Sequence, residues 1–301
     1  MPKQQRKPKE IGDRMKATTS REDGLKAFYN RTVYITGGSS GIGLEIARLM
    51  VSKGAHVALF ARNPEKLERA CKEIMNAKHD PSQKITAMPV DITDRKNVNR
   101  NMDEAVKQFG KPDILINCAG IIKADYFENI SYEDFDAVMK TNVYGARNMI
   151  AALFPAMKEK GGHIVNVSSA AGLMGMFSYT AYGASKFALV GFSDCLRSEM
   201  KLHNIDVSVV CPPEVKTPMN QEELKTIPPE ALAVKGLAGV LEPEYVAKVV
   251  IKGILKKKFL IIPGFKCRFL YVTQKCSPGW LSRAISDSAI RSAVKKIRRT
   301  A

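Results

Sequence analysis

Short apolar runs rich in β-branched residues alternate with amphipathic helical segments along most of the chain, and this alternation limits the fold more than any other feature. The runs predict strands at 31–36, 56–61, 85–90, 114–116, 164–167 and 207–210, and the segments between them predict helices at 44–53, 64–76, 98–109, 132–150, 184–200 and 243–255. Strands that alternate with helices form parallel sheets with helices on both faces. We therefore expect an α/β fold with a single doubly wound parallel sheet.

A glycine-rich segment at 36–43, Thr-Gly-Gly-Ser-Ser-Gly-Ile-Gly, joins the first predicted strand to the first predicted helix. Backbone N–H groups at such a turn, together with the helix dipole, make a site for an anion. Glycine is needed wherever a side chain would block the approach of a pyrophosphate. The segment predicts dinucleotide binding, and a purely structural turn is the alternative.

Polar residues follow several predicted strands, and ligands of parallel sheets bind at these carboxyl ends. They are Arg62, Asp91, Asn117, Ser169 and Thr217. An acidic residue after the second strand would repel a 2′-phosphate, but Arg62 stands there and no carboxylate comes before Glu65. We expect NADPH to bind more tightly than NADH, the alternative being an Arg62 that is only solvated. Asp91 is placed to accept from the adenine amino group, and Thr217 to bond the nicotinamide carboxamide.

Tyr182 and Lys186 are four residues apart at the start of a predicted helix, so they share one helical face. An ammonium lowers the pKa of a neighbouring phenol, and such a phenol is a competent acid or base. Ser169, thirteen residues before Tyr182, ends a predicted strand and can polarise the same substrate oxygen. An exposed Tyr–Lys pair without function is the alternative, and the serine and the glycine turn argue against it.

The net charge of +17 is concentrated at the two ends. Residues 1–31 hold nine Lys and Arg against four acids, residues 252–301 hold thirteen against one, and the middle is neutral. Basic ends favour binding to an anionic surface, either phospholipid headgroups or nucleic acid. Aromatic residues are not interleaved with the charges, which argues against a nucleic-acid partner.

Cysteine and histidine spacing indicates neither disulfides nor a metal site. The six cysteines have no framework spacing, which predicts free thiols in a reducing compartment, and the four histidines have no metal-ligand spacing. The first thirty residues are basic and polar without an apolar region, so we expect no signal peptide, and no run of 18 apolar residues predicts a membrane-spanning helix. We expect a cytoplasmic protein that can lie peripherally on the cytoplasmic face of a membrane.

Taken together, these motifs resemble the short-chain dehydrogenase/reductase family, whose fold is Rossmann-like, over about residues 31–253. The set comprises the glycine turn, Asn117-Cys118-Ala119-Gly120, Asn142 in a helix, Ser169 with Tyr182 and Lys186, and Thr217. The resemblance implies a catalytic tetrad of Asn142, Ser169, Tyr182 and Lys186. It also implies NADP(H) binding by Gly37, Ser39, Ser40, Gly41, Ile42, Gly43, Arg62, Asp91, Ile92, Asn117, Ala119, Gly120, Tyr182, Lys186, Pro212, Val215 and Thr217.

In this resemblance Tyr182 gives a proton to the carbonyl oxygen as hydride arrives from the nicotinamide, and Ser169 holds that oxygen. Lys186 lowers the pKa of Tyr182 and binds the nicotinamide ribose, and Asn142 supports a proton relay through a water. Two departures from the usual pattern are Cys118, where the family often has Asn, and Pro213, where it often has Gly. The Pro-Pro pair resembles the 3-ketosphinganine reductase branch.

The chain divides into a basic flexible arm at 1–27, a reductase domain at 28–255 with a substrate flap at 219–242, and a basic extension at 256–301. Residues 278–297 fit an amphipathic helix that carries Trp280 at its start. That helix lies on an anionic membrane, or it packs on the domain or on a partner subunit.

The expected activity is NADPH-dependent reduction of a ketone on a hydrophobic, long-chain lipid. A reductase of another hydrophobic ketone, 3-oxoacyl or steroid, uses the same tetrad and stays an alternative. A non-enzymatic nucleotide sensor is a further alternative, against which the intact tetrad argues. By family resemblance, the helices around 131–150 and 184–200 form a homodimer or homotetramer.

Overall fold

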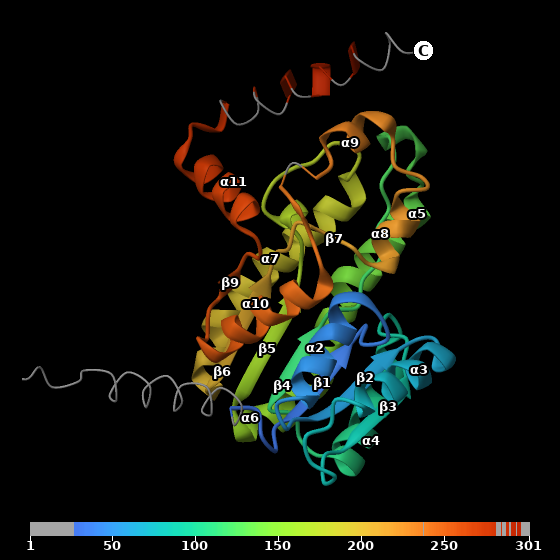
Figure 1. The fold of residues 1–301 in the computed structure, drawn as a ribbon, viewed down its shortest axis with the longest axis vertical. Helices are drawn as coiled ribbons and strands as arrows, with labels where there is room; N and C mark the ends of the chain where they lie inside the picture. The colour runs from blue at the N-terminus through green and yellow to red at the C-terminus, as the bar shows by residue number, and fades with distance from the viewer. Residues whose placement is uncertain are drawn as a thin grey trace, which may run out of the picture.

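The computed structural model describes residues 27–236 and 238–280, together with single positions between 284 and 295. Its centre is one sheet of seven parallel strands in the order β3-β2-β1-β4-β5-β6-β9 (Figure 1). The strands are β1 (Thr32–Thr36), β2 (His56–Ala61), β3 (Ile85–Pro89), β4 (Ile114–Asn117), β5 (Gly162–Val167), β6 (Ile205–Val210) and β9 (Leu260–Ile261). The predicted doubly wound parallel sheet is confirmed.

The strand order reverses at β1, because β2 and β3 lie on one side of it and β4 lies on the other. The register pairs Thr36, the last residue of β1, with Phe60 of β2 and with Asn117 of β4. A crevice opens outside the carboxyl ends of the strands at such a reversal, and ligands bind there. The topology therefore places the glycine turn after β1 at the edge of a crevice.

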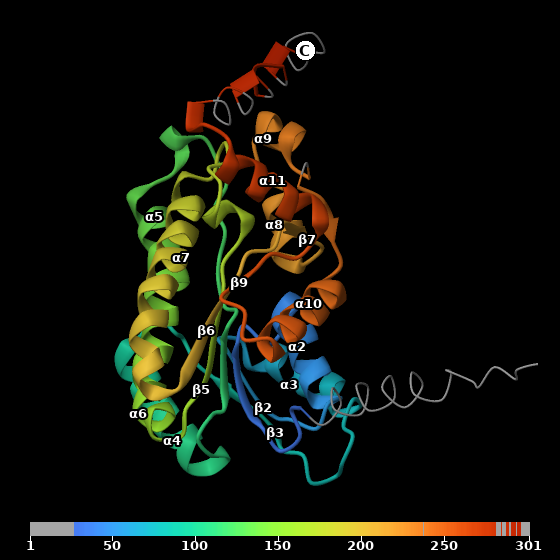
Figure 2. The same cartoon turned by 90° about the vertical axis from the view of Figure 1, so that its left-hand side faces the viewer.

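Helices cover both faces of the sheet (Figure 2). On one face lie α2 (Gly41–Val51), α3 (Pro64–Met75) and α10 (Pro243–Leu255), and on the other lie α4 (Arg95–Phe109), α6 (Ala146–Lys160) and α7 (Thr180–Met200). Val33 and Ile35 of β1 pack in the first core, and Tyr34 between them packs in the second. Burial on both sides explains why this strand is a continuous apolar run.

Four predicted helices differ from the structure by three or more residues at an end, or in their middle. α4 begins at Arg95 rather than at 98. α2 begins at Gly41 rather than at 44, and α7 begins at Thr180 rather than at 184, because the apolar positions that predicted them start only after the first turn. The helix expected over 132–150 consists of α5 (Tyr132–Met139), a π-helical segment η2 (Lys140–Gly145) and α6, which runs on to residue 160. Periodicity cannot locate a π-helical insertion, which carries no sequence mark of its own.

The expected flap at 219–242 contains α8 (Pro218–Glu223) and α9 (Pro229–Val234), which lie beyond the carboxyl ends of the strands (Figure 1). β7 (Glu214–Val215) and β8 (Val240–Leu241) pair in parallel at its base. β9 pairs with β6 and lies past the domain boundary expected at 255, so the sheet takes its last strand from the segment expected to be an extension. α11 (Phe265–Cys276) follows β9.

The arm expected at 1–27 lies outside the described residues apart from Ala27, as does much of the helix expected at 278–297. In the described part of the chain, no helix is long and apolar enough to cross a membrane. Short 3₁₀ turns lie at η1 (Phe127–Asn129), η3 (Ala170–Gly172) and η4 (Lys201–His203). All six cysteines are free, as expected.

Candidate active site

A cavity of about 1420 Å³ lies at the carboxyl ends of the strands, under the flap. Most of the residues predicted for the site line it: Gly37, Ser39, Ser40, Gly41, Ile42, Arg62, Asp91, Ile92, Ala119, Gly120, Ser169, Tyr182, Lys186, Pro212, Val215 and Thr217. Gly43, Asn117 and Asn142 do not line it. The fold thus brings together side chains from segments that are distant in the sequence.

The glycine turn has the open backbone that a pyrophosphate requires. Gly37 has φ +66°, and a Cβ at this position would lie 2.7 Å from the amide nitrogen of Ala119. Gly41 has φ +57°, and a Cβ at this position would lie 3.0 Å from the methyl carbon of Thr217. Both φ angles are positive, which favours glycine. The first turn of α2 has backbone N–H groups without partners inside the helix, and Gly41 and Ile42 of this turn line the cavity. These residues fit a dinucleotide phosphate.

Arg62, Asn63 and Lys66 line the end of the cavity beyond β2. Asn63 caps α3 by accepting from the backbone N–H of Lys66 at 2.8 Å. This cap fixes the first turn of α3, from which Lys66 lines the same cavity as Arg62. Asp91 also lines the cavity, and its Oδ1 accepts from the backbone N–H of Thr93 at 2.9 Å and from the Thr93 hydroxyl at 2.8 Å.

Tyr182 and Lys186 lie in the first part of α7 and are almost fully buried. The Lys186 Nζ lies 5.5 Å from the centre of the Tyr182 ring and donates to the carbonyl oxygen of Val167 at 3.0 Å. Ser169 follows β5 and begins the turn η3, where its Oγ accepts from the backbone N–H of Ala171 at 3.2 Å. The predicted phenol, ammonium and alcohol do converge.

The electrostatics of this group differ from the expectation. Burial raises the pKa of Tyr182 above its ordinary value, and a hydrogen bond with Ser169 lowers it by less than burial raises it. Burial also lowers the pKa of Lys186 to about 8. The Tyr182 pKa therefore does not show, in the protein alone, the net lowering expected from Lys186, because desolvation of the buried phenol dominates.

Asn142 lies in the π-helical segment, buried behind the cavity wall. Its amide holds the strand end after β4: Oδ1 accepts from the Ile121 N–H at 2.8 Å, and Nδ2 donates to the Ile121 carbonyl at 2.9 Å. A Cβ on Gly120 would lie 3.0 Å from Asn142 Oδ1 and 3.5 Å from Lys186 Nζ, so these two polar groups are close neighbours. The predicted link from Asn142 to Lys186 through a water stays a prediction.

Two other predicted cofactor residues have structural positions. Gly43 packs against the turn itself, where a Cβ would lie 2.4 Å from the carbonyl oxygen of Gly37. Asn117 is buried in the sheet and donates to Asn166 Oδ1 at 2.9 Å. Thr217 lines the cavity, and it also caps α8 through its Oγ1, which accepts from the N–H of Asn220 at 3.3 Å.

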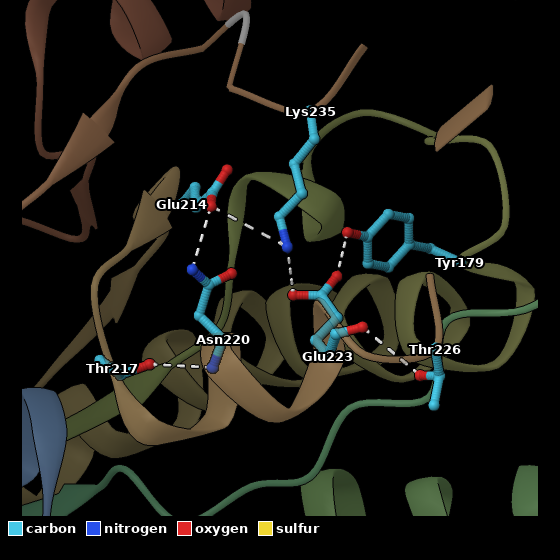
Figure 3. A network of polar contacts seen from close by, with 7 residues as sticks. All are labelled: Tyr179, Glu214, Thr217, Asn220, Glu223, Thr226 and Lys235. Atoms are coloured by element: carbon cyan, nitrogen blue, oxygen red, sulfur yellow. Dashed lines mark hydrogen bonds and ion pairs between the residues drawn. The ribbon is translucent and has the colours of Figure 1, made fainter. Parts of the chain in front are cut away.

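Sequence analysis did not find the polar residues on the flap side of the cavity (Figure 3). Tyr179, Glu214, Glu223 and Lys235 line the cavity and contact one another, and Lys66 lines its opposite end. Glu223 and Lys235 are twelve residues apart, a spacing that predicts no contact. The one local signal is Tyr179, which lies three residues before Tyr182 at the N-cap of α7.

Comparison with known proteins agrees with this fold. The short chain dehydrogenase family model matches residues 31–228. The chain belongs to this family and is an oxidoreductase. A 3-dehydrosphinganine reductase from Danio rerio is 40% identical over 229 residues, which cover 75% of this chain and 69% of that protein.

Solved structures of the family have the same architecture. A short chain dehydrogenase from Mycobacterium paratuberculosis bound to NAD has a TM-score of 0.70 and 25% identity, covering 80% of this chain and 99% of that one. A variant of actinorhodin polyketide ketoreductase with NADPH has a TM-score of 0.69 and 27% identity, covering 77% and 95%.

Proposed function

We propose that the protein reduces the ketone of a long-chain lipid of the 3-ketosphinganine type to an alcohol, with NADPH as the reductant. One observation carries the proposal: Tyr182, Lys186 and Ser169 meet in the same cavity as the glycine turn of α2. The similarity to a 3-dehydrosphinganine reductase supports the substrate class. The size of the cavity, about 1420 Å³, suits a cofactor together with an elongated substrate.

The cofactor, when bound, supplies the hydride. Backbone N–H groups around Gly37 and Gly41 would hold its pyrophosphate, and Lys186, which donates to the Val167 carbonyl at 3.0 Å, would bond the nicotinamide ribose. Burial raises the pKa of Tyr182, so the phenol carries its proton at neutral pH. A protonated phenol is the form that donates to a ketone oxygen, and Ser169 orients that oxygen.

The choice of NADPH over NADH rests on the charge beyond β2. Arg62 and Lys66 both line that end of the cavity. Two cations attract a 2′-phosphate, whereas a carboxylate in their place would repel it. Isothermal titration with both reduced cofactors measures the preference, and tighter binding of NADH contradicts the proposal.

A panel of ketones tests the reaction itself. We expect NADPH oxidation with 3-ketosphinganine and slower oxidation with a 3-oxoacyl thioester or a steroid ketone. Tyr182→Phe removes the proton donor, so turnover falls at least about 1000-fold while NADPH still binds by titration. Turnover of the variant within about tenfold of the wild type means that Tyr182 is not the acid.

We also propose that α11 docks the protein on the cytoplasmic face of an anionic membrane. Leu270, Thr273 and Gln274 of α11 line the cavity, whereas Phe265 and Phe269 are 82% and 56% exposed. Three cations, Lys266, Arg268 and Lys275, belong to the same helix. A helix with exposed aromatic and basic residues suits a lipid interface, and its cavity-lining residues put the site beside the lipid.

Co-sedimentation with phosphatidylserine vesicles tests this docking. Phe265→Ser combined with Phe269→Ser is expected to abolish sedimentation, because both exposed rings are lost. Tyr245→Ser on α10 removes a ring of similar exposure, 47%, and serves as the control. Equal sedimentation of the double variant and the wild type contradicts the role of α11.

A homodimer or homotetramer is proposed through the face of α5, η2 and α7. Exposed aromatic side chains gather on these elements: Tyr132, Phe135, Tyr144 and Phe187. Apolar rings on a surface of this kind are typical of subunit interfaces. Light scattering after size-exclusion chromatography gives the mass, and a monomer at micromolar concentration contradicts the proposal.

A further inference from the structure

The cavity holds a second polar cluster, which the reduction described above does not use (Figure 3). The Lys235 ammonium lies 2.7 Å from Glu223 Oε2 and 3.9 Å from Glu214 Oε1. The Tyr179 hydroxyl donates to Glu223 Oε1, and Asn220 Nδ2 donates to Glu214 Oε1 at 3.0 Å. The cluster therefore joins β7, α8, the segment after α9 and the start of α7.

The cluster has a surplus of negative charge in a buried place. The side chains of Glu223, Lys235 and Glu214 are 5%, 7% and 15% exposed. The Lys235 ammonium lies near both carboxylates, but it is in close contact only with that of Glu223. Among the described residues, no donor reaches Oε2 of Glu214. A buried carboxylate without its own counter-charge is costly, so the cluster favours one more cation.

This surplus lies beside the catalytic phenol. The Tyr179 ring, whose hydroxyl contacts Glu223, has its centre 5.8 Å from that of Tyr182. Burial first, and the charge of Glu223 to a lesser extent, raise the pKa of Tyr182. Tyr182, Glu214 and Glu223 line one cavity, so a ketone that reaches Tyr182 shares this space with the two carboxylates.

We propose that Glu214, together with Glu223, binds the ammonium group of a substrate that carries a primary amine on the carbon next to the ketone. This proposal rests on the proposed function and names a specificity determinant within it. The substrate ammonium donates to the free oxygen of Glu214, and Lys235 keeps Glu223 and Glu214 close enough to share the two cations. Such charge-assisted hydrogen bonds are the strong ones in a partly desolvated site.

The same arrangement selects against ketones that lack the amine. A ketone substrate without the amine brings no positive charge to the two carboxylates. The carboxylates then stay unpaired and partly desolvated, which weakens the binding of that substrate. Since Glu214 is 15% exposed rather than fully buried, water compensates for some of this loss. We expect a preference of at least about tenfold in kcat/KM for the amino ketone over its deaminated analogue.

Steady-state kinetics with two matched substrates test the proposal. The substrates are 3-ketosphinganine and the same chain with hydrogen in place of the amine, each with saturating NADPH. Glu214→Gln keeps the shape and removes the charge, so we expect the preference to fall at least about tenfold, mainly through a higher KM for the amino ketone. Glu242→Gln is the matched control, because that side chain is 56% exposed, pairs with Lys216 and does not line the cavity, so we expect this variant to keep the preference.

A pH series gives a second readout. In the wild type, KM for the amino ketone rises as the substrate ammonium loses its proton, at about pH 8 for an α-amino group, and KM for the deaminated ketone does not follow it. Titration with NADPH checks that the Glu214 variant is folded.

The possible failures are distinguishable. If the wild type reduces neither ketone, the proposed function is wrong. If it reduces both equally well, or if Glu214→Gln retains the preference, the reductase stands and the amine site is overturned.

Discussion

Replacing Lys186 by Met is expected to stabilise the fold at pH 7 while it removes turnover. Lys186 is 5% exposed, and among the described residues no carboxylate lies within ion-pair distance of its ammonium. Its contacts are the Val167 carbonyl at 3.0 Å and the Tyr182 ring at 5.5 Å. Burial therefore lowers the pKa of Lys186 from 10.5 to about 8.

The size of the effect follows from the difference between these two pKa values. At about 1.4 kcal/mol for each pKa unit, keeping the buried ammonium charged costs roughly 3 kcal/mol of folding free energy. Met has a similar length and no charge, so it removes this cost. Losing the hydrogen bond to Val167 destabilises the variant by roughly 1–2 kcal/mol. The free energy of unfolding of Lys186→Met is therefore expected to exceed that of the wild type by about 1–2 kcal/mol.

The pH dependence of the free energy of unfolding tests whether the buried ammonium of Lys186 destabilises the fold. Between pH 8 and 10.5 the unfolded chain binds a proton at Lys186 that the folded chain does not, so wild-type stability gains a contribution as pH rises. That contribution is complete above about 10.5 and is lost as pH falls through about 8. Urea unfolding at pH 7, 8.5 and 9.5 should therefore show the advantage of Lys186→Met shrinking as pH rises.

The matched control is Lys72→Met, since Lys72 lies on α3 and is 71% exposed. Its effect on stability should not change with pH over this range. A Lys186→Met variant that is less stable than the wild type at pH 7, or an advantage that is independent of pH, refutes the argument that burial of this ammonium destabilises the fold.

Three further predictions concern the cofactor cradle and its support. Gly37→Ala places a Cβ 2.7 Å from the Ala119 nitrogen at φ +66°, so NADPH binding measured by titration weakens at least about tenfold; unchanged affinity refutes the cradle. Arg62→Asp reverses the preference from NADPH to NADH in the same assay, and retention of the NADPH preference counts against Arg62. Asn142→Ala leaves the N–H and carbonyl groups of Ile121 unpaired, which lowers Tm by roughly 5–10 °C; a change below about 2 °C contradicts this role.

The sequence by itself determined the layered fold and much of the site. The alternation of apolar runs and helical segments is local, and so is the spacing of Tyr182 and Lys186, which fixes them on one face of α7. The glycines at 37 and 41 mark positive φ angles, which few other residues adopt. Patterns of this kind depend only on neighbouring residues, so the sequence alone indicates them.

Only the tertiary structure decided what surrounds those residues. Burial, which no sequence pattern expresses, made the pKa of Tyr182 rise where a local argument expected it to fall. The contact of Glu223 with Lys235 and the pairing of β9 with β6 join residues that no spacing relates. Desolvation and long-range contacts depend on how the whole chain packs, because the cost of a charge is set by every group around it and not by its neighbours in sequence.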